Sequence, residues 1–576
     1  MKEKFLQDRN SKIIKILIYF MIFVFILILR LIYLQIKNES KFSALGKKNF
    51  LRTETISPLR GNIVDSSGHL LASNKPIYDL YWIGGGERSI SKKQEFIFNK
   101  LLNILDLDSL QADKIDSIRF ANRNSKKILL QEDLDFKQLC IISEQCAESE
   151  NLEIKSRFIR IYPYKKLASH LLGYLSRTIE DYTTKGLSGL EKMFQDQLKG
   201  QTGYALNVIN SKGKKIDQLE YSQPMQGNDL RLTIDLNLQY LAEKTFEKDQ
   251  VGAFILMNPR DGAIKALASF PQFDPNDFMH PISREEWNEK FIYNNAFLNR
   301  TTTATYPPAS IFKLITFAAG LEEGVISKDE EFNCKGFINF CGRRYHCIRH
   351  WGHGKLDSKD ALAYSCNIPC YEIAQKLSIN ELADYAYRFG LGKKTGFLLP
   401  ENYGLVPTYE WKVATIGQRW WTGETLSVSI GQSYTSVTPL QMVRMIASIS
   451  TGYLVKPRIL EQEDLKVDEL DISKDTLIFL RKALREVVKK GSAKILNKIK
   501  NIKVFAKTGT AQTSSLTIEK KTKEHLEHAW LATYFKYKQE DPLALVVLVE
   551  HVGSSKFAKE IAAKFLKSYC DFRSET

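Results

Sequence analysis

The sequence lacks internal repeats, long low-complexity tracts and, beyond its N-terminal segment, any second hydrophobic run long enough to cross a bilayer. These absences exclude a repeat architecture and a membrane protein with several spans. No zinc finger, basic heptad segment or other nucleic-acid-binding signature is present either. We therefore expect no nucleic-acid partner, although Lys and Arg outnumber Asp and Glu by 82 to 66 and the formal net charge is +16. Such a charge suits an anionic membrane surface or an acidic polymer, or it is simply a solvated basic surface.

The length and composition indicate a globular protein of at least two domains. A chain of 576 residues is too long for one compact domain, and 44% hydrophobic with 26% charged residues is an ordinary globular balance. Short strands are predicted over residues 49–83, amphipathic helices over residues 88–160, and a hairpin over residues 250–270. VFAKTGTAQ, HAWLATYFKYK and PLALVVLVEHV are predicted strands, and SSKFAKEIAAKFLKSYC is a predicted helix. Strands and helices in separate blocks favour the α+β class.

One hydrophobic segment lies near the N-terminus. Residues 16–29 (ILIYFMIFVFILIL) carry no charge, and Lys15 and Arg30 bracket them. As a helix, residues 13–36 would reach roughly 36 Å. That length spans the roughly 30 Å hydrocarbon core if the two flanking cations extend outward. We predict that residues 13–36 form a transmembrane anchor.

The flanks of this segment predict its orientation and its retention. Basic residues precede it, so residues 1–12 are expected to form a cytoplasmic tail. No A-x-A-like site closes the run, which favours a retained anchor over a cleaved signal peptide. The bulk of the protein is then expected to lie outside the cytoplasm. The preceding cations are Lys2, Lys4, Arg9, Lys12 and Lys15.

The stretch TYPPASIFK places a serine and a lysine three residues apart. On a helix, Ser310 and Lys313 would share one face within hydrogen-bond reach. A lysine desolvated in a cleft can be neutral enough to serve as the base that activates a serine. The alternative is an ordinary serine at the start of a helix. The same spacing also occurs at Ser89 and Lys92, and at Ser211 and Lys214.

Two further motifs favour the catalytic interpretation. Ser365-Cys366-Asn367 and Lys507-Thr508-Gly509 follow in the order of the S-x-x-K, S-x-N and K-T-G set of penicillin-interacting serine enzymes. Each has a competitor, namely Ser378-Ile-Asn380 and Lys394-Thr395-Gly396. The second competitor lies in a loop composition, whereas VFAKTGT is predicted to be a strand that lines a cleft. On such a strand glycine permits close approach of a substrate to the backbone.

The chain resembles the class B penicillin-binding proteins over nearly its whole length after the anchor. The resemblance is carried by PLRGNIVDSSGHLLASN, RIYPYKKLASHLLGYL, GLSGLEKMFQDQLKGQTG, LTIDLNLQ, VSIGQSYTSVTPLQ and HAWLATYF. The block YRFGLGKKTGF also resembles a family loop, which removes Lys394 as a competitor. The WGHG stretch before SCN and the single anchor are most similar to the elongation-type enzymes, penicillin-binding protein 2. The septal-division enzymes are the runner-up.

The resemblance implies an elongated, mixed pedestal domain over residues 37–235 and a transpeptidase domain over residues 236–576. The latter is expected to combine an antiparallel sheet flanked by helices with an all-helical lobe. The implied function is a peptidoglycan D,D-transpeptidase that serves lateral wall elongation and cell shape and is a target of β-lactams. The implied location is the cell (inner) membrane, with the catalytic domain on the periplasmic side.

The implied partners are peptidoglycan stem peptides, the membrane, a SEDS-type glycosyltransferase and scaffold proteins of the elongation complex. Two alternatives belong to other classes. A β-lactamase shares the three motifs but would need neither an anchor nor a pedestal. A non-catalytic penicillin-binding sensor or scaffold would not need an intact set of catalytic motifs.

The resemblance also implies a catalytic role for five motif residues. Ser310 is the expected nucleophile and Lys313 its base. Ser365 is expected to relay a proton between Lys313 or Lys507 and the departing D-alanine. Asn367 is expected to hydrogen-bond the donor peptide and to steady Lys313.

The K-T-G strand is expected to bind the substrate. Thr508 and Thr510, with Gly509 between them, are implied to hold the terminal carboxylate together with the motif lysine. The sequence departs from the family at two positions, because Ala309 and Ser433 stand where glycine is usual. Both residues are small, so we expect a local adjustment of the backbone and no loss of the chemistry. The affinity for β-lactams is the property that these two substitutions would change.

A cluster of cysteines and histidines surrounds the S-x-N motif. Zinc favours four nitrogen or sulfur ligands at short spacings, and some elongation-type relatives are similar here and carry a metal. The resemblance implies Cys347, His353 and Cys366 as ligands, with Cys334 as the fourth and Cys341 as the second choice. The chemistry itself needs no cofactor, so a zinc ion would brace the catalytic loop. The alternative is one or two disulfides, which the compartment permits.

Overall fold

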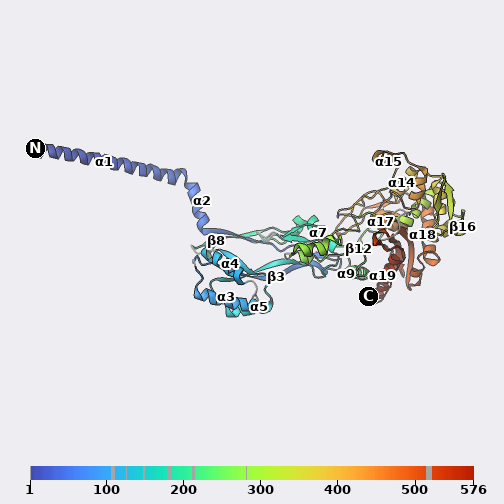
Figure 1. The fold of residues 1–576 in the computed structure, drawn as a ribbon, viewed down its shortest axis with the longest axis horizontal. Coiled ribbons are helices and arrows are strands. Elements are labelled where there is room, and N and C mark those ends of the chain that lie inside the picture. The colour runs from blue at the N-terminus through green and yellow to red at the C-terminus, as the bar shows by residue number, and fades with distance from the viewer. Residues whose placement is uncertain are drawn as a thin grey trace. The chain divides into compact units, whose positions relative to one another are not determined.

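A computed structural model describes residues 2–87, 89–105, 111–124, 126–146, 149–177, 184–210, 215–279, 282–513 and 522–575. The chain forms two compact units, each built from segments distant in sequence (Figure 1). The first combines Met1–Leu59, Lys75–Ile159 and Gly200–Gln226, and the second combines Arg60–Asn74, Arg160–Lys199 and Gly227–Thr576. Part of the predicted pedestal range therefore belongs to the second unit.

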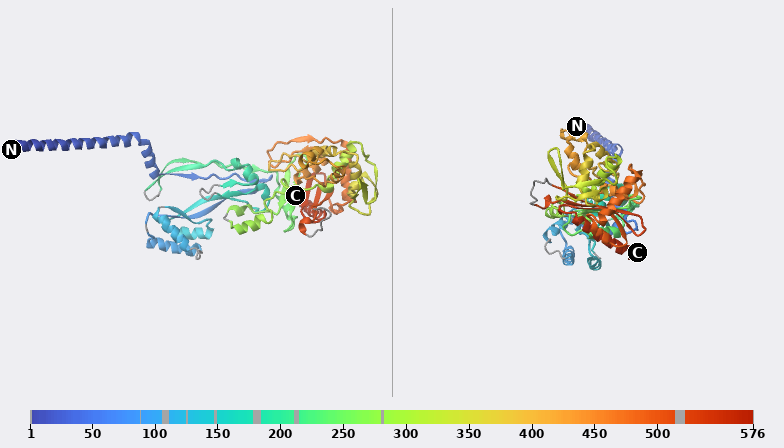
Figure 2. Two further views of the ribbon diagram at one scale, coloured as in Figure 1. Left: turned by 45° about the horizontal axis from the view of Figure 1, so that its top comes forward. Right: turned by 90° about the vertical axis from the view of Figure 1, so that its right-hand side faces the viewer.

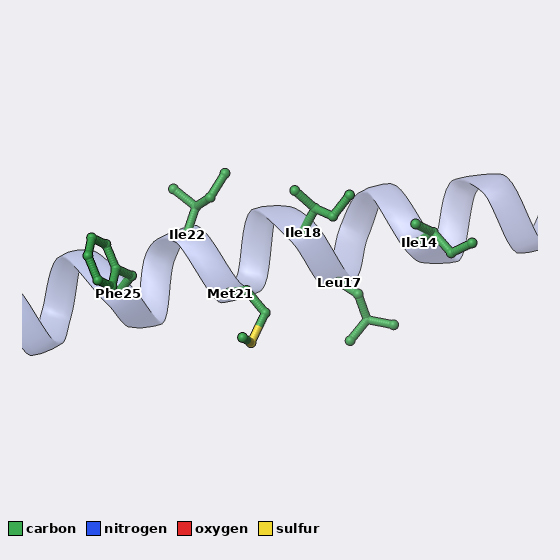
Figure 3. A pocket seen from close by; sticks show the side chains of 6 residues that line it. All are labelled: Ile14, Leu17, Ile18, Met21, Ile22 and Phe25. Atoms are coloured by element: carbon green, nitrogen blue, oxygen red, sulfur yellow. The ribbon is translucent and has the colours of Figure 1, made fainter.

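The first unit begins with a long apolar helix, as predicted. Helix α1 (Lys2–Ile32) continues through a π-helical turn (Tyr33–Lys37), and α2 (Glu39–Phe50) follows after a bend (Figure 2). Figure 3 shows six apolar side chains of α1 at the i, i+3 and i+4 spacing of one helix face. The stretch Lys12–Lys37 is long and apolar enough to cross a bilayer, and none of it is buried. It agrees with the predicted span of residues 13–36 to within one residue at each end.

The rest of the first unit contains strands and a small helical layer. Strand β8 (Gly203–Ile209) pairs antiparallel with β1 (Leu51–Ile56) and with β9 (Lys215–Ser222). The long strand β3 (Leu70–Ile83) pairs with β4 (Lys127–Gln131) and β5 (Leu152–Ile161). Three helices contribute buried residues to one core with β3, and this core includes the fully buried Trp82. They are α3 (Lys92–Leu105), α4 (Gln111–Arg123) and α5 (Phe136–Gln145).

The second unit is built on a five-stranded antiparallel sheet in the order β12-β11-β21-β20-β19. The predicted hairpin is confirmed as β11 (Gly252–Met257) and β12 (Ile264–Phe270). The three predicted C-terminal strands are confirmed as β19 (Ile502–Ala511), β20 (His528–Tyr537) and β21 (Leu543–Val549). Strand β19 lies at the edge of this sheet.

Both faces of this sheet are buried, which explains the continuous apolar runs in its central strands. Successive side chains of a strand point to opposite faces. On β11, Ala253 and Ile255 share a core with α17 (Pro439–Thr451), whereas Phe254 packs in the other core with the C-terminal helix α19 (Lys556–Glu575). Helix α9 (Leu236–Lys244) contributes to the same core as α19.

A helical lobe follows β12 in the sequence and also carries two small sheets. Strand β13 (Glu331–Cys334) pairs with β16 (Gly354–Asp357), and β14 (Phe337–Phe340) pairs with β15 (Arg343–His346). The lobe is therefore not purely helical, because the stretch between residues 336 and 354 contains four glycines at positive φ, which permit the tight turns between these short strands. The helices of the lobe are α11 (Lys313–Glu322), α12 (Ser358–Ala363), α13 (Ile368–Ala374), α14 (Ile379–Arg388), α15 (Tyr409–Ile416), α16 (Thr422–Ser429) and α18 (Lys474–Lys489).

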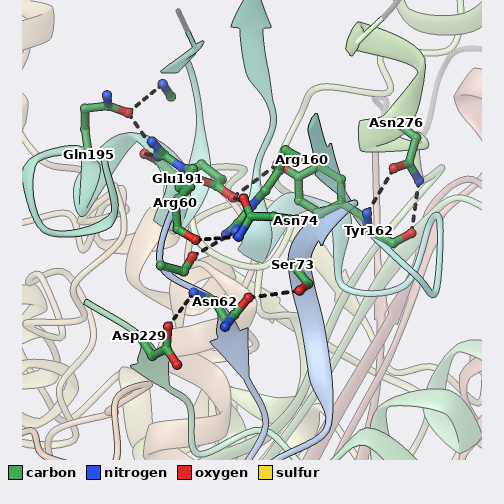
Figure 4. Close-up of polar contacts among 12 residues, drawn as sticks. Arg60, Asn62, Ser73, Asn74, Arg160, Tyr162, Glu191, Gln195, Asp229 and Asn276 are labelled. Carbon is green, nitrogen blue, oxygen red and sulfur yellow. Dashed lines mark hydrogen bonds and ion pairs between the residues drawn. The ribbon is translucent and has the colours of Figure 1, made fainter. Parts of the chain in front are cut away.

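A buried ionic network joins three segments of the second unit (Figure 4). Glu191, fully buried, receives Arg60 Nε at 2.6 Å and Arg160 Nε at 2.7 Å, and Tyr162 donates to the same carboxylate at 3.2 Å. An unpaired charge here would be costly, so the three segments are held together. The network joins residues 60–74 to residues 160–199, and hydrogen bonds of Tyr162 with Asn276 and of the Leu236 amide with Asp65 tie these two segments to the C-terminal part of the unit. Short elements nearby are β2 (Ile63–Val64), α6 (Ser169–Leu172), β6 (Leu175–Arg177), β7 (Thr184–Gly186), α7 (Gly189–Met193), α8 (Gln195–Leu198) and β10 (Leu230–Arg231).

Candidate active site

The S-x-x-K segment sits against the sheet at the start of α11. Two hydrogen bonds fix the approach to it, from Trp530 Nε1 to the Pro307 carbonyl at 3.0 Å and from the Ala309 amide to the Gly431 carbonyl at 2.9 Å. Ser310 lies in a short 3-10 turn (Ala309–Ile311), and Lys313 is the first residue of α11. The predicted helical placement therefore holds for the lysine, while the serine occupies the tighter turn that leads into the helix.

Lys313 is completely buried and held by the S-x-N loop. Its Nζ lies 2.6 Å from the Ser365 carbonyl oxygen, 3.2 Å from Ser365 Oγ and 2.6 Å from Asn367 Oδ1. Burial of the ammonium group holds the pKa of Lys313 below its ordinary value. Lys313 is thus biased toward the neutral form that a general base requires.

Lys507 approaches the same hydroxyl from the sheet. Its Nζ lies 2.9 Å from Ser365 Oγ, and its side chain is also completely buried. Burial, and after it the charge of Lys313, holds the pKa of Lys507 well below its ordinary value. A hydroxyl has one proton and two lone pairs, so Ser365 can donate to one amine while it accepts from the other. The arrangement can pass a proton between the two lysines.

Ser310 stands apart from this network in the described part of the chain. Its side chain is half-buried, and no hydrogen bond joins its Oγ to a described residue. The Oγ is free to meet a substrate, with Lys313 one helical turn away. Catalytic hydrogen bonds of this kind often tighten only when substrate is bound.

The K-T-G residues lie on β19, as predicted. Because β19 is an edge strand paired only with β20, its other side is available to a ligand. Thr508 is buried, and its Oγ1 shares a hydrogen bond of 2.6 Å with Ser492 Oγ. A Cβ at Gly509 would lie 3.3 Å from both the Ala309 Cβ and the Pro308 carbonyl oxygen. Glycine here permits the strand to pack closely against the segment that carries the nucleophile.

The competing motifs have structural roles elsewhere. Ser378 caps α14, where its side chain and that of Glu381 form a capping box. Thr395 binds Glu401 through its amide at 2.9 Å and its hydroxyl at 2.7 Å, within a loop. Ser89 is exposed just before α3. The remaining S-x-x-K match, with Ser211 and Lys214, lies outside the described residues.

The two departures from the family fall where the backbone is left-handed. Ala309 has φ of 52° and Ser433 has φ of 69°, in the region that favours glycine. Ser365 in the S-x-N motif adopts the same region, with φ of 56°. Strain of roughly 1–2 kcal/mol is expected at each such position. The preference of the family for glycine at the first two positions thus has a local backbone cause.

The four residues predicted as metal ligands come together beside the S-x-N loop. The ligand atoms of Cys334, Cys347, His353 and Cys366 all lie within 4.8 Å of one another. His353 Nδ1 is 3.5 Å from Cys347 Sγ and 3.6 Å from Cys334 Sγ, and the sulfurs of Cys347 and Cys366 are 3.7 Å apart. About 3.8 Å is expected between two sulfurs of a tetrahedral zinc site with Zn–S of about 2.3 Å.

This donor set fits zinc chemically as well. Three sulfurs and one imidazole nitrogen are a common set for a structural zinc site. A disulfide requires an S–S separation of about 2.05 Å, and all eight cysteines are free. The hydrogen bond with Cys366 lowers the pKa of Cys347 to about 4, whereas the same bond raises the pKa of Cys366. Cys341, the second choice for a ligand, is exposed and does not join the cluster.

A carboxylate that the sequence did not single out braces the nucleophile segment. Glu550, the residue after β21, accepts hydrogen bonds from Arg300 Nε at 2.9 Å and Tyr306 Oη at 2.5 Å. Tyr306 also pairs through its backbone with Val437 in both directions at 2.9 Å. No short motif marks these residues, because Glu550 and Arg300 are 250 positions apart in the chain.

Two family models match the chain. The model described as "Penicillin binding protein transpeptidase domain" matches residues 252–568, and "Penicillin-binding Protein dimerisation domain" matches residues 55–232. "Peptidoglycan D,D-transpeptidase MrdA" of Acinetobacter baumannii is 29% identical, over 91% of this chain and 83% of that protein.

Two solved structures have the same fold over nearly the whole chain. The complex between penicillin-binding protein (PBP2) and MreC from Helicobacter pylori aligns with a TM-score of 0.76 at 25% identity, over 92% of this chain and 100% of that one. A chain from "Structural coordination of polymerization and crosslinking by a peptidoglycan synthase complex" also aligns with a TM-score of 0.76, at 28% identity, over 97% and 98% of the two chains.

Proposed function

Because the chain belongs to the penicillin-binding protein transpeptidase family, we propose that it is a serine-type peptidoglycan D,D-transpeptidase of cell-wall elongation. One observation carries the proposed mechanism. Two buried lysines share the hydroxyl of Ser365, and the half-buried Ser310 lies in the turn that leads directly into the helix of Lys313, which supplies a candidate nucleophile, base and proton relay. Such a set performs acyl transfer through a covalent serine ester.

In the first half-reaction, Ser310 Oγ attacks the carbonyl carbon of the penultimate D-alanine of a donor stem peptide. Its proton passes to the neutral amine of Lys313. The C–N bond to the terminal D-alanine then breaks, and the leaving nitrogen takes a proton through Ser365 Oγ. The products are an ester on Ser310 and free D-alanine.

In the second half-reaction, an amine of a neighbouring stem peptide attacks the ester carbonyl. The relay of Ser365 and Lys313 removes one proton from the attacking nitrogen. The C–O bond to Ser310 breaks, and the proton returns to the Ser310 oxygen. A new amide links the two peptides, and the enzyme is restored.

The edge strand β19 supplies the donor-binding side of the site. Lys507 and the hydroxyls of Thr508 and Thr510 bind the terminal carboxylate of the donor. Arrival of that carboxylate favours a proton on Lys507, which reverses the effect of burial on its pKa. The backbone N–H groups of Ser310 and Thr510 stabilise the oxyanion that forms at the attacked carbonyl.

The elongation role is favoured over the septal one by the relatives. The A. baumannii relative carries the name MrdA, and the H. pylori neighbour is penicillin-binding protein 2 in a complex with MreC. A scaffold protein of that kind and a peptidoglycan polymerase of the SEDS type are the partners we propose for this chain. A role in septal division is the less favoured alternative.

The apolar stretch Lys12–Lys37 anchors the protein to the inner membrane as a single span. The cations that precede it keep the N-terminal tail in the cytoplasm. The catalytic unit then acts in the periplasm, where its peptidoglycan substrate lies.

Zinc is proposed as a structural ion held by Cys334, Cys347, His353 and Cys366. A bound zinc would hold the loops together by coordinating these four side chains, and it would take no part in the reaction of the peptide. Cys366 is the middle residue of the S-x-N motif, so its position affects both neighbours. The metal would therefore brace Ser365 and Asn367 against the lysines.

Labelling with a fluorescent penicillin tests the enzyme function. We expect the full-length protein to form a covalent adduct and Ser310→Ala to form none. Ser89→Ala is the matched control, because Ser89 has the same spacing to a lysine but is exposed elsewhere, and it should label like the wild type. Intact-protein mass spectrometry should give a mass increase of one penicillin per chain. A wild type that takes up no label would contradict the enzyme and favour a non-catalytic scaffold.

A further inference from the structure

A strongly basic segment borders the active site. Residues 335–355 contain five lysines and arginines and no aspartate or glutamate. Within the described part of the chain, none of these five cations forms an ion pair, whereas many other lysines and arginines of the protein do. Unpaired cations that are close together in one segment attract a negatively charged ligand. The five are Lys335, Arg343, Arg344, Arg349 and Lys355.

Aromatic side chains alternate with the cations on this surface. Arg349 stacks over Trp351 at 5.6 Å, and Arg419, in the loop between α15 and α16, stacks over Trp421 at 4.0 Å. Trp351 is 80% exposed and Trp421 is 51% exposed. Each indole ring thus carries a guanidinium over one face while much of the side chain stays open to a ligand. Arg343 and Arg344 are neighbours on β15, so their side chains leave opposite faces of the hairpin. We call the set, on the hairpin, the turn after it and the loop before α16, the basic aromatic surface, and it consists of Arg343, Arg344, Arg349, Trp351, Arg419 and Trp421.

Hydrogen bonds connect this surface directly to the catalytic residues. Asn367 Nδ2 donates to the His346 carbonyl at 3.0 Å, while its Oδ1 accepts from Lys313 at 2.6 Å. His346 is the last residue of β15, two positions after Arg344. The hairpin thus lies one side chain away from the catalytic lysine, on the side of the S-x-N loop.

The second segment of the surface is tied to the first. Tyr345 Oη donates to the Gly423 carbonyl at 3.3 Å. Gly423 lies two residues after Trp421, at the start of α16. The hairpin and the loop before α16 are therefore neighbours, and their cations can act on one ligand.

We propose that the basic aromatic surface binds the acceptor stem peptide through its free carboxylates and so directs the acceptor amine to the acyl-enzyme. This inference rests on the proposed transpeptidase function and adds the second substrate to it. The terminal carboxylate of the donor is assigned to β19, so the cations on the S-x-N side are available to a second peptide. Arginine binds carboxylates in a two-point fashion that also orients the ligand.

Orientation of the acceptor explains how such a site can favour an amine over water. The ester on Ser310 reacts with whichever nucleophile is held near its carbonyl, and holding an amine there raises its effective concentration. The competing interpretation is contact with an anionic membrane, because arginine and tryptophan also suit lipid headgroups. The direct link through Asn367 to Lys313 favours the peptide.

The test compares the full-length double variant Arg343→Gln/Arg344→Gln with the wild type in two assays. Penicillin acylation reports the donor half-reaction and requires no acceptor. Transfer from a donor stem peptide to an amine-bearing acceptor stem peptide reports both halves. We expect unchanged penicillin acylation and a rise of about tenfold in KM for the acceptor. An acceptor whose carboxylates are amidated should show no difference between the variant and the wild type.

Two further variants make the result specific. Arg419→Gln, on the other segment of the surface, should change acceptor KM in the same direction and guards against misfolding of the double variant. Arg260→Gln/Arg284→Gln removes two positive charges elsewhere on the same unit and should leave transfer unchanged. Each variant is assayed in detergent and in vesicles of phosphatidylcholine with and without phosphatidylglycerol.

Three results would overturn the inference while the proposed function stands. In the first, the double variant shows normal penicillin acylation and the same acceptor KM as the wild type. In the second, its transfer activity falls equally with the normal and the amidated acceptor. In the third, its defect appears only in vesicles that contain phosphatidylglycerol. The last result would assign the surface to the membrane. Failure of the wild type to react with penicillin would instead overturn the proposed function itself.

Discussion

Lys507 donates a hydrogen bond to Ser365 over 2.9 Å, although 142 positions separate the two residues in the chain. The bond joins the edge of the sheet to the helical lobe. The same Ser365 hydroxyl lies 3.2 Å from Lys313, so it connects the two buried amines of the site. Two buried ammonium groups so close would repel each other, which favours a neutral amine on at least one side.

Removal of this hydroxyl should slow acylation without unfolding the protein. For Ser365→Ala we expect the second-order rate of acylation by penicillin to fall by about 10²–10⁴-fold, the range typical of a lost proton-transfer group. Rapid labelling followed by mass spectrometry measures the rate. Ser378→Ala is the control, since Ser378 belongs to the competing motif and caps α14. It should lose about 1 kcal/mol of stability and keep its acylation rate, and equal rates in the two variants would refute the relay.

The buried lysines should make both activity and stability depend on pH. Their pKa values are lowered by burial, so acylation should decline as the pH is lowered through the pKa of Lys313. For stability, the unfolded chain binds a proton on Lys507 below its ordinary pKa of 10.5, whereas the folded chain does not until the lowered pKa is reached. The free energy of unfolding should therefore rise with pH between these two values, by up to about 1.4 kcal/mol per pH unit for each lysine.

A methionine at position 507 provides the test of this slope. Lys507→Met removes the titrating group, so the dependence of the unfolding free energy on pH should become shallower. Lys503→Met is the matched control on the same strand, because the Lys503 side chain is exposed. Denaturant unfolding in detergent at several pH values measures both. A slope in Lys507→Met equal to that of the wild type would show that Lys507 does not carry the effect.

The sulfur cluster should contain one zinc ion per chain. Elemental analysis of the purified protein is expected to find it, and Cys366→Ser should lose it. Because metal binding contributes to folding, that variant should melt at least about 5 °C lower. Cys140→Ser is the control, since Cys140 is exposed and outside the cluster. Absence of zinc together with an oxidised Cys347 would assign these cysteines to disulfides.

Glycine at position 309 should relieve backbone strain next to the nucleophile. The φ of 52° costs alanine roughly 1–2 kcal/mol, whereas glycine loses about 0.5–1 kcal/mol through the entropy of the unfolded chain. Ala309→Gly is therefore expected to raise the free energy of unfolding by up to about 1 kcal/mol. Ala319→Gly, inside α11, should lower it by about 1 kcal/mol or more. Denaturant titration distinguishes them, and a loss of stability in Ala309→Gly would contradict the strain.

Tyr306, through its hydrogen bond to Glu550, should position the nucleophile and take no direct part in the reaction. Tyr306→Phe is expected to lose about 1–3 kcal/mol of stability, as for a bond to a charged group, and to slow acylation by about tenfold through displacement of the segment before Ser310. Tyr385→Phe is the matched control, because Tyr385 donates to Glu323 at 2.7 Å away from the site. It should lose similar stability at an unchanged acylation rate. An equal effect of the two variants on acylation would leave Tyr306 with a purely structural role.

The sequence by itself determined the local features of this protein. The charge-free run of residues 16–29 predicted the apolar helix, because a bilayer-spanning helix needs only length and composition. The turn residues within 250–270 predicted a hairpin, and the apolar run LALVVLV predicted a strand. Both signals depend only on residues a few positions apart. The three motifs predicted which serines and lysines to bring together, and the strand composition of VFAKTGT separated it from the competing K-T-G match in a loop.

The tertiary structure decided what depends on contacts between distant segments. Nothing in the spacing of Ser365 and Lys507 predicts a shared hydroxyl, and nothing near Glu550 marks it as a partner of Tyr306. The cluster around Cys347 follows from loops that return to one place through left-handed turns, which a residue pattern cannot specify. Tyr162 and Asp65, in segments assigned by sequence to the pedestal, likewise bind Asn276 and Leu236 of the catalytic unit. Periodicity reports which face of an element is buried, and only packing determines which other element covers it.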